Sequence, residues 1–364
     1  MKLTVSTAML LEALRKVLSV VSTRSTIPVL ANVLLVGRNG RLVLTTTDLE
    51  VCISTSIDAT IEREGETTLP AKRFGQIVGT LPGGNVTLDT SEDLATRITC
   101  GPAFFKIMGI DATEFPKEPD FTEERKIALP SSEFAKTLRK ISYGVSTDQT
   151  RYVLNGILLS IRDGNFIAVA TDGRRLALVE KLLENNDGVA DGDVILPIKV
   201  VHELERLLDE EGNVTIRFSE ARASFSVAHT SVVTKLVEGN YPNYRQVIPA
   251  SFKNSVIIPR EKFLEVLNRV SVVVTDAAAS VRVNLDKNIL TMSASSSEVG
   301  EATEPLEVAF TGEGVNIAFN PAFLRDPIKQ LECDELTLRF NDEFKPVVLL
   351  GDEGFLYVIM PMRS

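Results

Sequence analysis

The sequence predicts an α+β protein built from three repeated modules, each with two helices packed on antiparallel sheets. One helical pattern, in which apolar residues recur three and four positions apart, occurs three times, and so does a second pattern that runs into a strand-like segment. The first pattern lies at 5–14, 129–138 and 258–267, the second at 69–81, 196–208 and 319–331, and the strand-like segments at 85–88, 213–216 and 335–338. One module used three times explains this constant spacing.

The length of the chain agrees with this count, because 364 residues allow three units close to the commonest domain size. The expected modules are residues 1–123, 124–250 and 251–364. Segments 116–126 and 247–255 are expected to connect them, since the first is rich in proline and charge and neither is of low complexity.

Between the helices, polar and apolar residues alternate as they do in a strand with one buried face. The alternating stretches are 41–57, 152–162, 165–180, 281–294 and 346–359. Hairpin turns are expected at Asn39-Gly40, Gly83-Gly84, Asp163-Gly164 and Asp352-Glu353-Gly354. Short turns between neighbouring strands require antiparallel pairing. Pro327, inside the pattern at 319–331, is expected to kink that helix or to shift its start.

The composition is that of an ordinary soluble protein, with 44% hydrophobic and 24% charged residues and no apolar run of membrane-spanning length. Near the amino terminus, Glu12, Arg15 and Lys16 interrupt the apolar residues at helical spacing, which predicts an amphipathic helix and not a signal peptide. The three cysteines have an odd count and no metal-like spacing, so we expect reduced thiols in a cytoplasmic protein.

The charge distribution tells more than the net charge of −10, which by itself argues against nucleic-acid binding by bulk attraction. The six helical segments together have a net positive charge, so the net charge of the rest of the chain is more negative than −10. In the first helix of each module, a matched leucine is followed by a basic pair or an Asn-Arg pair. These are Leu14 before Arg15-Lys16, Leu138 before Arg139-Lys140 and Leu267 before Asn268-Arg269. A solvated helix face explains any one of these pairs, but their repetition at one register predicts a shared basic lining.

The sequence offers little for an enzyme. His202 and His229 are its two histidines, lie far apart and form no local metal motif, and there is no glycine-rich phosphate loop. Thr47-Asp48-Leu49 and Thr171-Asp172-Gly173 suggest catalytic carboxylates, but they occupy equivalent points of two modules. A repeated structural turn explains that spacing better than two active sites, so we expect a non-catalytic protein with no metal or cofactor.

Several segments together resemble the bacterial DNA polymerase III beta subunit, the replication sliding clamp, over the whole chain. They are 1–5 (MKLTV), 24–30 (RSTIPVL), 45–50 (TTTDLE), 151–156 (RYVLNG), 170–177 (ATDGRRLA), 241–249 (YPNYRQVIP) and 357–363 (YVIMPMR). The resemblance implies the DNA clamp fold, with two chains joined head to tail in a closed ring around duplex DNA. It also implies a peptide pocket between modules 2 and 3 that docks the polymerase III alpha subunit, the clamp loader and other replication and repair proteins.

The resemblance assigns residues to three surfaces. One subsite of the peptide pocket comprises Leu154, Thr171, Gly173, Arg174, Arg175, Leu176, Pro242, Val247, Val358 and Met360, and the other comprises Arg151, Val153, Asn320, Phe323, Pro361, Met362 and Arg363. The DNA-contacting residues are Arg24 and Gln149, together with the lining residues Arg15, Lys16, Arg139, Lys140 and Arg269. The dimer contacts are Phe105 and Ile107 of one chain against Val272 and Val273 of the other.

Two features of the pocket leave its details open. Position 174 is Arg where relatives often have His, and position 246 is Gln where some have Arg, so the preferred peptide is expected to differ. Leu154, Leu176 and Val358, taken singly, are more typical of core residues. The alternative function is a repeat-built peptide-binding scaffold that never encircles DNA, and retention on circular but not linear DNA separates the two.

Overall fold

The computed structural model describes residues 1–22, 26–117, 121, 125–183, 190–208, 212–275 and 280–362. These residues form two compact units: Met1–Ala135 with His202–Leu236, and Lys136–Val201 with Val237–Ser364. The helices α1 to α6 are Thr7–Val17, Ala71–Thr80, Ser131–Ser142, Ile198–Leu207, Arg260–Val270 and Pro321–Gln330. No helix among the described residues is long and apolar enough to span a membrane.

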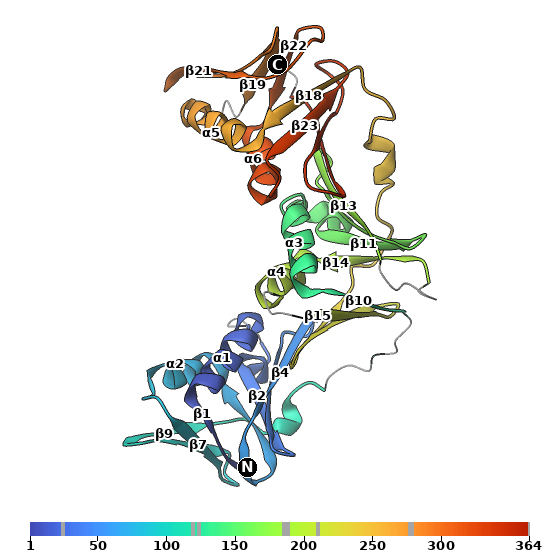
Figure 1. The fold of residues 1–364 in the computed structure, drawn as a ribbon. Coiled ribbons are helices and arrows are strands. Elements are labelled where there is room, and N and C mark those ends of the chain that lie inside the picture. Colours follow the sequence, from blue (N-terminus) through green and yellow to red (C-terminus); the bar gives the residue numbers. More distant parts are fainter. Residues whose placement is uncertain are drawn as a thin grey trace. The chain divides into compact units, whose positions relative to one another are not determined.

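The first unit contains two antiparallel sheets (Figure 1). In sheet order, the smaller one consists of β5 (Thr60–Arg63), β1 (Lys2–Ser6), β7 (Asn85–Thr90), β8 (Ala95–Cys100) and β9 (Ala103–Met108). The larger one consists of β10 (Arg125–Pro130), β15 (Asn213–Phe218), β16 (Arg222–Val227), β17 (Thr230–Lys235), β4 (Val51–Asp58), β3 (Arg41–Thr47), β2 (Asn32–Arg38) and β6 (Gly65–Pro70).

The second unit repeats this plan. Its larger sheet consists of β14 (Gly192–Pro197), β11 (Gly156–Arg162), β12 (Asn165–Thr171), β13 (Arg175–Leu182), β25 (Phe355–Ile359), β24 (Val347–Leu350), β23 (Glu335–Phe340) and β18 (Asn254–Pro259). Its smaller sheet consists of β21 (Gly300–Glu307), β20 (Ile289–Ser296), β19 (Val281–Asp286) and β22 (Val315–Phe319). Short 3₁₀ turns lie at Leu18–Val20, Pro28–Ala31, Ala112–Glu114 (η3), Gln149–Leu154 (η4), Tyr244–Val247 (η5) and Ser271–Val273 (η6).

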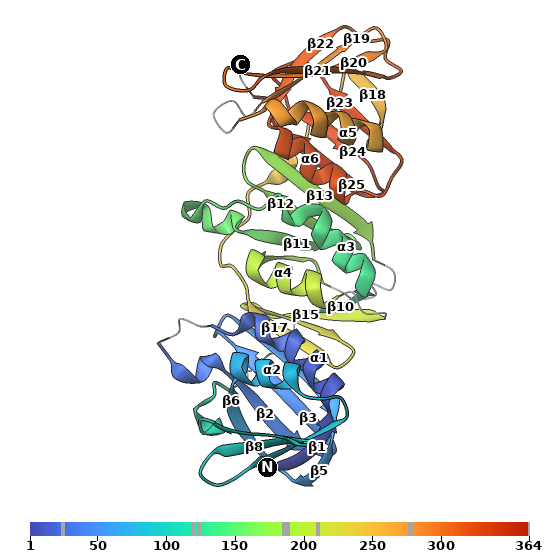
Figure 2. The same ribbon diagram turned by 90° about the vertical axis from the view of Figure 1, so that its left-hand side faces the viewer.

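Paired helices cover one face of the sheets in each unit, because each helix buries one apolar stripe. In the first unit α1 and α2 lie side by side over β2, β3 and β4 (Figure 2). α5 and α6 contact each other in the second unit. The matched residues Leu14, Leu138 and Leu267 are fully buried, so the repeated pattern marks three equivalent core positions.

A repeated hydrogen bond confirms that the modules share one design. The first backbone N–H of a helix has no partner within the helix. Thr7 donates its N–H to the Gly84 carbonyl at 2.9 Å, and Arg260 donates to Asp334 at 2.9 Å. The corresponding N–H of Ser131 donates to Gly212 at 2.8 Å. In all three places the acceptor immediately precedes the strand after the second helix.

Three sequence expectations need correction. Gly83-Gly84 joins α2 to β7 and is not a hairpin turn, and the alternation over 152–155 belongs to the 3₁₀ turn η4. The other long alternating stretches each divide into two strands, as at β3 and β4, because a tight turn interrupts them. The expected hairpins at Asn39-Gly40, Asp163-Gly164 and Asp352-Glu353-Gly354 are confirmed.

Pro327 lies within α6, and the start of this helix is not shifted relative to α2 and α4. A proline has no N–H to donate to the carbonyl four residues earlier, here that of Phe323. The hydroxyl of Tyr357 donates to this oxygen at 2.8 Å, and the Tyr357 side chain is fully buried. The structure therefore supplies from β25 the hydrogen bond that the proline removes from α6.

Candidate functional site

A Thr-Asp turn between β12 and β13 is the local frame of the candidate site. The Thr171 hydroxyl donates to the Arg175 carbonyl at 2.6 Å and accepts from the N–H of Gly173 at 3.1 Å. One oxygen of Asp172 accepts from the N–H groups of Arg174 and Arg175 at 2.8 and 3.0 Å. Gly173 has a φ of +84°, which favours glycine. This side-chain bonding fixes the turn without any catalytic role for Asp172.

The turn at 47–51 has the same bonds, as the equivalent spacing predicts. Thr47 donates to the carbonyl of Val51 at 3.0 Å, and the Asp48 carboxylate accepts from the N–H groups of Glu50 and Val51 at 3.0 and 2.8 Å. Leu49, with a φ of +78°, takes the place of Gly173. The prediction of a repeated structural turn is confirmed.

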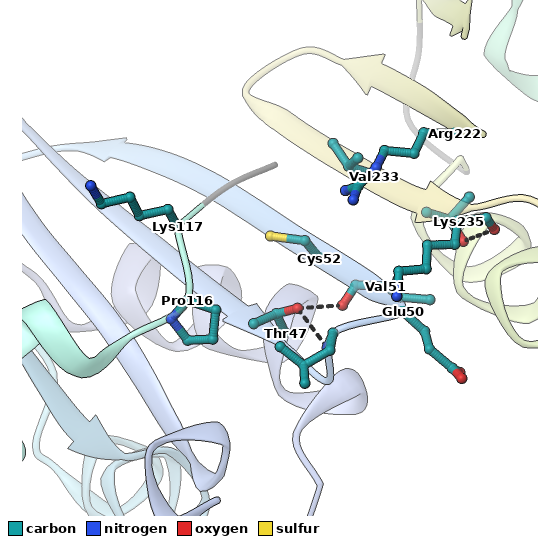
Figure 3. A pocket seen from close by; sticks show the side chains of 11 residues that line it. Thr47, Glu50, Val51, Cys52, Pro116, Lys117, Arg222, Val233 and Lys235 are labelled. Atoms are coloured by element: carbon teal, nitrogen blue, oxygen red, sulfur yellow. Dashed lines mark hydrogen bonds between the residues drawn. The ribbon is translucent and has the colours of Figure 1, made fainter. Parts of the chain in front are cut away.

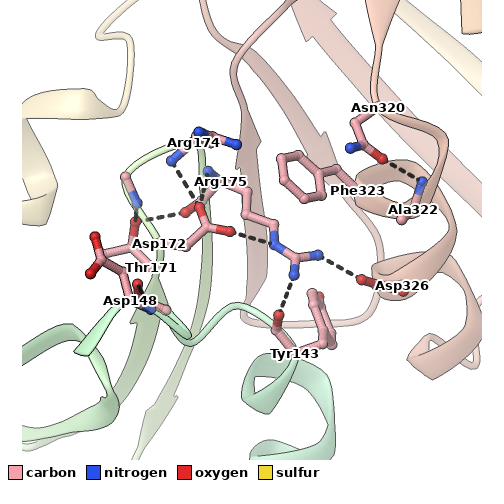
Figure 4. Close-up of polar contacts among 12 residues, drawn as sticks. Tyr143, Asp148, Thr171, Asp172, Arg174, Arg175, Asn320, Ala322, Phe323 and Asp326 are labelled. Carbon is pink, nitrogen blue, oxygen red and sulfur yellow. Dashed lines mark hydrogen bonds and ion pairs between the residues drawn. The ribbon is translucent and has the colours of Figure 1, made fainter. Parts of the chain in front are cut away.

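Arg175 is the centre of a polar network that joins this turn to α6 (Figure 4). Its guanidinium donates to Asp172 at 3.0 Å, to Asp326 at 2.6 Å and to the carbonyl of Tyr143 at 2.5 Å. It also stacks on Phe323, 4.3 Å from the ring centroid. Only 11% of the Arg175 side chain is exposed. Burial alone would lower the pKa of Arg175, but the bond to Asp326 and the charges of Tyr357, Asp172 and Asp326 together raise it above its ordinary value.

A small pocket of about 50 Å³ lies beside the network. Its lining comprises Thr171, Gly173, Arg174, Arg175, Leu176, Val247, Val358 and Met360. Leu176 and Val358 are each only 2% exposed and belong to a core cluster of this unit, so they form a rigid apolar floor. Val247 and Met360 are exposed large apolar side chains at the rim. An apolar floor with mobile methionine and polar groups at the rim suits a short peptide better than a small polar ligand.

The chain after β25 is held against this pocket by its backbone. Met360 donates its N–H to the carbonyl of Arg174 at 2.9 Å, and Met362 donates to Ala318 at 2.8 Å. The side chains of Met360 and Met362 are 41% and 40% exposed. Fixed backbone with exposed thioethers provides adaptable contact area on a positioned segment.

The other residues assigned to the pocket lie around it in the second unit. Leu154 is buried and Pro242 is exposed, and an added Cβ on Gly173 would lie 3.0 Å from the Arg151 guanidinium. Asn320 caps α6 by accepting from the N–H of Ala322 at 2.9 Å. Val153 is half-buried, as are Phe323 and Pro361. Arg363 lies outside the described residues.

The basic residues assigned to DNA differ in their surroundings. Arg15 and Gln149 are exposed, Arg139 is half-buried, and Lys16 pairs with Glu12 at 3.5 Å. Arg24 lies outside the described residues. Lys140 is 11% exposed in a 2.5 Å ion pair with Asp352, and Arg269 pairs with Glu304 at 2.7 Å. Lys140 and Arg269 therefore meet carboxylates of their own chain in this conformation.

The residues assigned to the dimer contact lie on an edge strand in one unit and on a 3₁₀ turn in the other. Phe105 and Ile107 are half-buried on β9, which is the last strand of its sheet. The outward side chains of β9 include Phe104 and Met108, 62% and 58% exposed. In the other unit Val272 is 75% exposed on η6. Edge strands with exposed apolar residues are ready to pair with another chain.

Among the described residues, no group of three or more His, Cys, Asp or Glu side chains is arranged to hold a metal ion. The cysteines are thiols: Cys52 and Cys100 are buried and Cys333 is half-buried. Burial, followed by the Asp352 carboxylate, raises the pKa of Cys333 to about 11, so this thiol is a poor nucleophile at neutral pH.

Comparison with known families decides the identity of the fold. Three family models match consecutive segments: the DNA polymerase III beta subunit N-terminal domain at residues 1–119, its central domain at 128–243 and its C-terminal domain at 245–363. The chain belongs to the DNA polymerase III beta subunit family. It has the three-domain DNA clamp fold of this family and functions as a sliding clamp.

Named relatives and solved structures match over the full length. The beta sliding clamps of Chlamydia muridarum and Caulobacter vibrioides are 32% and 33% identical; each alignment covers 100% of this chain, and 99% and 100% of the relative. The DNA polymerase sliding clamp structure from Bacillus subtilis matches with a TM-score of 0.96 at 29% identity, covering 100% of this chain and 99% of that one. A sliding clamp from Bartonella birtlesii, solved bound to griselimycin, matches with a TM-score of 0.94 at 32% identity and full coverage of both chains.

Eight of the residues assigned from the sequence line one pocket in the structure. The sequence assignment missed the polar network beside this pocket. Tyr143, Asp326 and Tyr357 were not assigned to the site, although their side chains or backbone surround Arg175 or Phe323. Asp172 was recognised only as a turn residue. The one available signal was an Arg inside an alternating strand pattern, which implies a buried partner for its charge.

Proposed function

We propose that two copies of this chain close head to tail into a ring that encircles duplex DNA and tethers the replicative polymerase. The observation that carries the proposal is the match of all three beta-subunit domain models, in order, along one chain. Each chain has three modules, so a ring of two chains would line its hole with equivalent helices from six modules. A two-fold axis would join the β9 end of each chain to the η6 end of the other.

The electrostatics of the edge strands support this pairing. Lys106 is exposed on β9, and Arg97 is exposed on the neighbouring β8. β21, an edge strand of the other unit, has the exposed Glu301 and Glu307, whereas its Glu304 is already paired with Arg269. Opposite charges on two unpaired edges favour the heterologous contact over pairing of either edge with itself.

The proposed mechanism is topological. A closed ring leaves DNA only by opening or by sliding off an end, so weak contacts between basic residues and phosphates are sufficient. The net charge of −10 then disfavours DNA on the outer surface. The proposed function requires no catalytic group, metal or cofactor, and replication of DNA places it in the cytoplasm.

The ring is tested by loading the protein onto a nicked circular plasmid and then cutting the plasmid once. The protein should co-elute with the circle in gel filtration and be released after the cut. In a matched control, a second protein is bound tightly on each side of the cutting site. Both new DNA ends are then blocked, so the ring should stay on the DNA after cutting. Equal retention on open linear DNA would favour the alternative, a peptide-binding scaffold that does not encircle DNA.

We further propose that the pocket at Gly173 and Met360 receives short peptides of the polymerase III alpha subunit, the clamp loader and repair proteins. The apolar floor, the exposed Arg174 and the two methionines support this assignment. Replacing Met360 and Met362 with Ala should weaken binding of polymerase-derived peptides, measured by fluorescence anisotropy, while the dimer persists. Replacing Met9, an exposed methionine on α1, is the matched control. Unchanged affinity in the double variant would place the pocket elsewhere.

A further inference from the structure

The first unit contains a second pocket at the structural equivalent of the first. It has a volume of about 310 Å³ and lies where β4 pairs with β17 (Figure 3). Its lining comprises Thr47, Leu49, Glu50, Val51, Cys52, Pro116, Lys117, Arg222, Val233, Thr234 and Lys235. All of these residues belong to one compact unit.

Strand register establishes the equivalence residue by residue. Cys52 pairs across its hairpin with Thr47 and across the neighbouring strand with Val233. Leu176 pairs in the same way with Thr171 and with Val358. Seven of the eight residues that line the smaller pocket therefore have a counterpart in the larger one. The eighth, Val247, is the last residue of η5, whereas Pro116 and Lys117 follow η3; both turns come after the last strand of their module.

The side chains that differ between the two pockets place the cations differently. Lys235 takes the place of Met360, and Lys117 and Arg222 add two further cations, whereas Glu50 takes the place of Arg174. Val51 takes the place of Arg175, whose guanidinium is already bonded to Asp172 and Asp326. Lys117 and Lys235 are exposed, and no ion pair joins Lys117, Arg222 or Lys235 to another residue in the described part of the chain. The walls remain apolar, since the buried Cys52 and Val233 take the places of the floor residues Leu176 and Val358. Val51 is also buried, and Leu49, 46% exposed, lies at the rim.

We propose that this pocket, which we call the 47/235 pocket, is a second docking site and that it binds an acidic peptide of a partner protein through one apolar anchor. The apolar floor provides a place for the anchor, and the cations at the rim complement flanking carboxylates. A DNA backbone would use the same cations but would leave the apolar floor unfilled, so a peptide fits the lining better. This inference does not depend on ring closure or on the occupant of the smaller pocket.

The test uses the full-length protein with Leu and Val methyl groups labelled for NMR. The probe is a synthetic peptide of sequence Asp-Glu-Gly-Leu-Gly-Glu-Asp, in which Leu is the one apolar anchor, and its matched control replaces every acid with the corresponding amide. The acidic peptide should shift the methyl signals of Leu49, Val51 and Val233, and the amide peptide should bind about tenfold more weakly, as expected when several rim ion pairs are lost. Equal affinity for both peptides, or no shift at these methyls, would overturn the proposal.

Charge-reversal variants assign the effect to the 47/235 pocket. Arg222→Glu with Lys235→Glu should weaken the acidic peptide about tenfold, whereas Lys72→Glu with Arg73→Glu on α2 changes the net charge equally and should leave affinity unchanged. Lys117→Glu, at an exposed position, is the second variant should the double reversal not fold. Shifts at Val247 and Val358 in place of Val51 and Val233 would overturn the assignment. So would a duplex oligonucleotide that shifts the Val51 and Val233 methyls at lower concentration than the peptide.

Discussion

Replacing Arg175 with Met should loosen the contact between the Thr-Asp turn and α6 while leaving the fold intact. Met preserves the unbranched stem that packs on Phe323 but removes the guanidinium. Asp172, Asp326 and the carbonyl of Tyr143 then lose their shared donor. The neighbouring Arg174 is exposed, so Arg174→Met is a control of identical chemistry at an adjacent position.

The size of the effect follows from the burial of each partner. A hydrogen bond to a charged group contributes about 1.5–3 kcal/mol, and the loss is greatest where the remaining group stays buried. Arg175 is 11% and Asp172 17% exposed, but Asp326 is 34% exposed and regains water. Asp172 also keeps its two backbone donors. With these discounts we expect a net loss of about 3 kcal/mol.

Hydrogen exchange measured by mass spectrometry localises this loss. If the amides of α6 exchange through opening of this contact, a loss of about 3 kcal/mol lowers their protection roughly 150-fold. Arg174→Met should change protection by less than about twofold, the normal range for a surface substitution. Arg175→Lys should fall between them, because it retains the charge but not the planar fork. Equal protection of α6 in the Arg175→Met and Arg174→Met variants would refute the central role of Arg175.

Three further predictions test other parts of the structure. Val273→Asp should give a folded monomer by sedimentation, because it places a charge in the proposed apolar dimer contact; a dimer of unchanged stability would remove Val273 from that contact. Tyr357→Phe should destabilise α6 by about 1–2 kcal/mol by hydrogen exchange, and the loss should shrink in a Pro327→Ala background that restores the helical N–H; equal losses in both backgrounds would contradict the compensation. Burial alone would raise the pKa of Asp352, but Lys140 and the N–H groups of Glu332 and Cys333 hold it below its ordinary value of 3.8. The ion pair should therefore stabilise the protein above that pH and be lost as the pH falls through the folded-state pKa, so the melting-temperature difference between Asp352→Asn and the unmodified chain should disappear in acid.

Local chemistry was predictable from the sequence. The helix starts near Thr7, Ser131 and Arg260 follow from apolar spacing, and the Thr-Asp turns follow from side chains that bond the backbone two to four residues away. Each depends on neighbours in the sequence, so one chain is sufficient to see it. Gly83-Gly84 was misassigned because a glycine pair fits a helix-to-strand connection as well as a hairpin.

Long-range pairing was not predictable in the same way. β17 pairs with β4 and β13 pairs with β25 across the expected module boundaries, but a period of two specifies only which face a strand buries and not which strand lies beside it. The partners of Arg175 come from three separate segments, so their proximity depends on this pairing. Eight residues that the resemblance assigned to one subsite nevertheless line one small pocket, because the resemblance carried three-dimensional information that periodicity lacks.

The cross-module pairing also explains how the pockets arise. Where β4 meets β17, and again where β13 meets β25, a Thr-Asp turn lies beside the end of a strand from the next module. The backbone frame is the same in both places, because the turn bonds itself and the ladder fixes the register. Only the side chains are then free to vary, and they do: Gly173 with Met360 in one place, Leu49 with Lys235 in the other. A repeated fold that makes the same hollow at successive module junctions can therefore acquire separate ligand preferences by substitution at a few rim positions, without any change to its core.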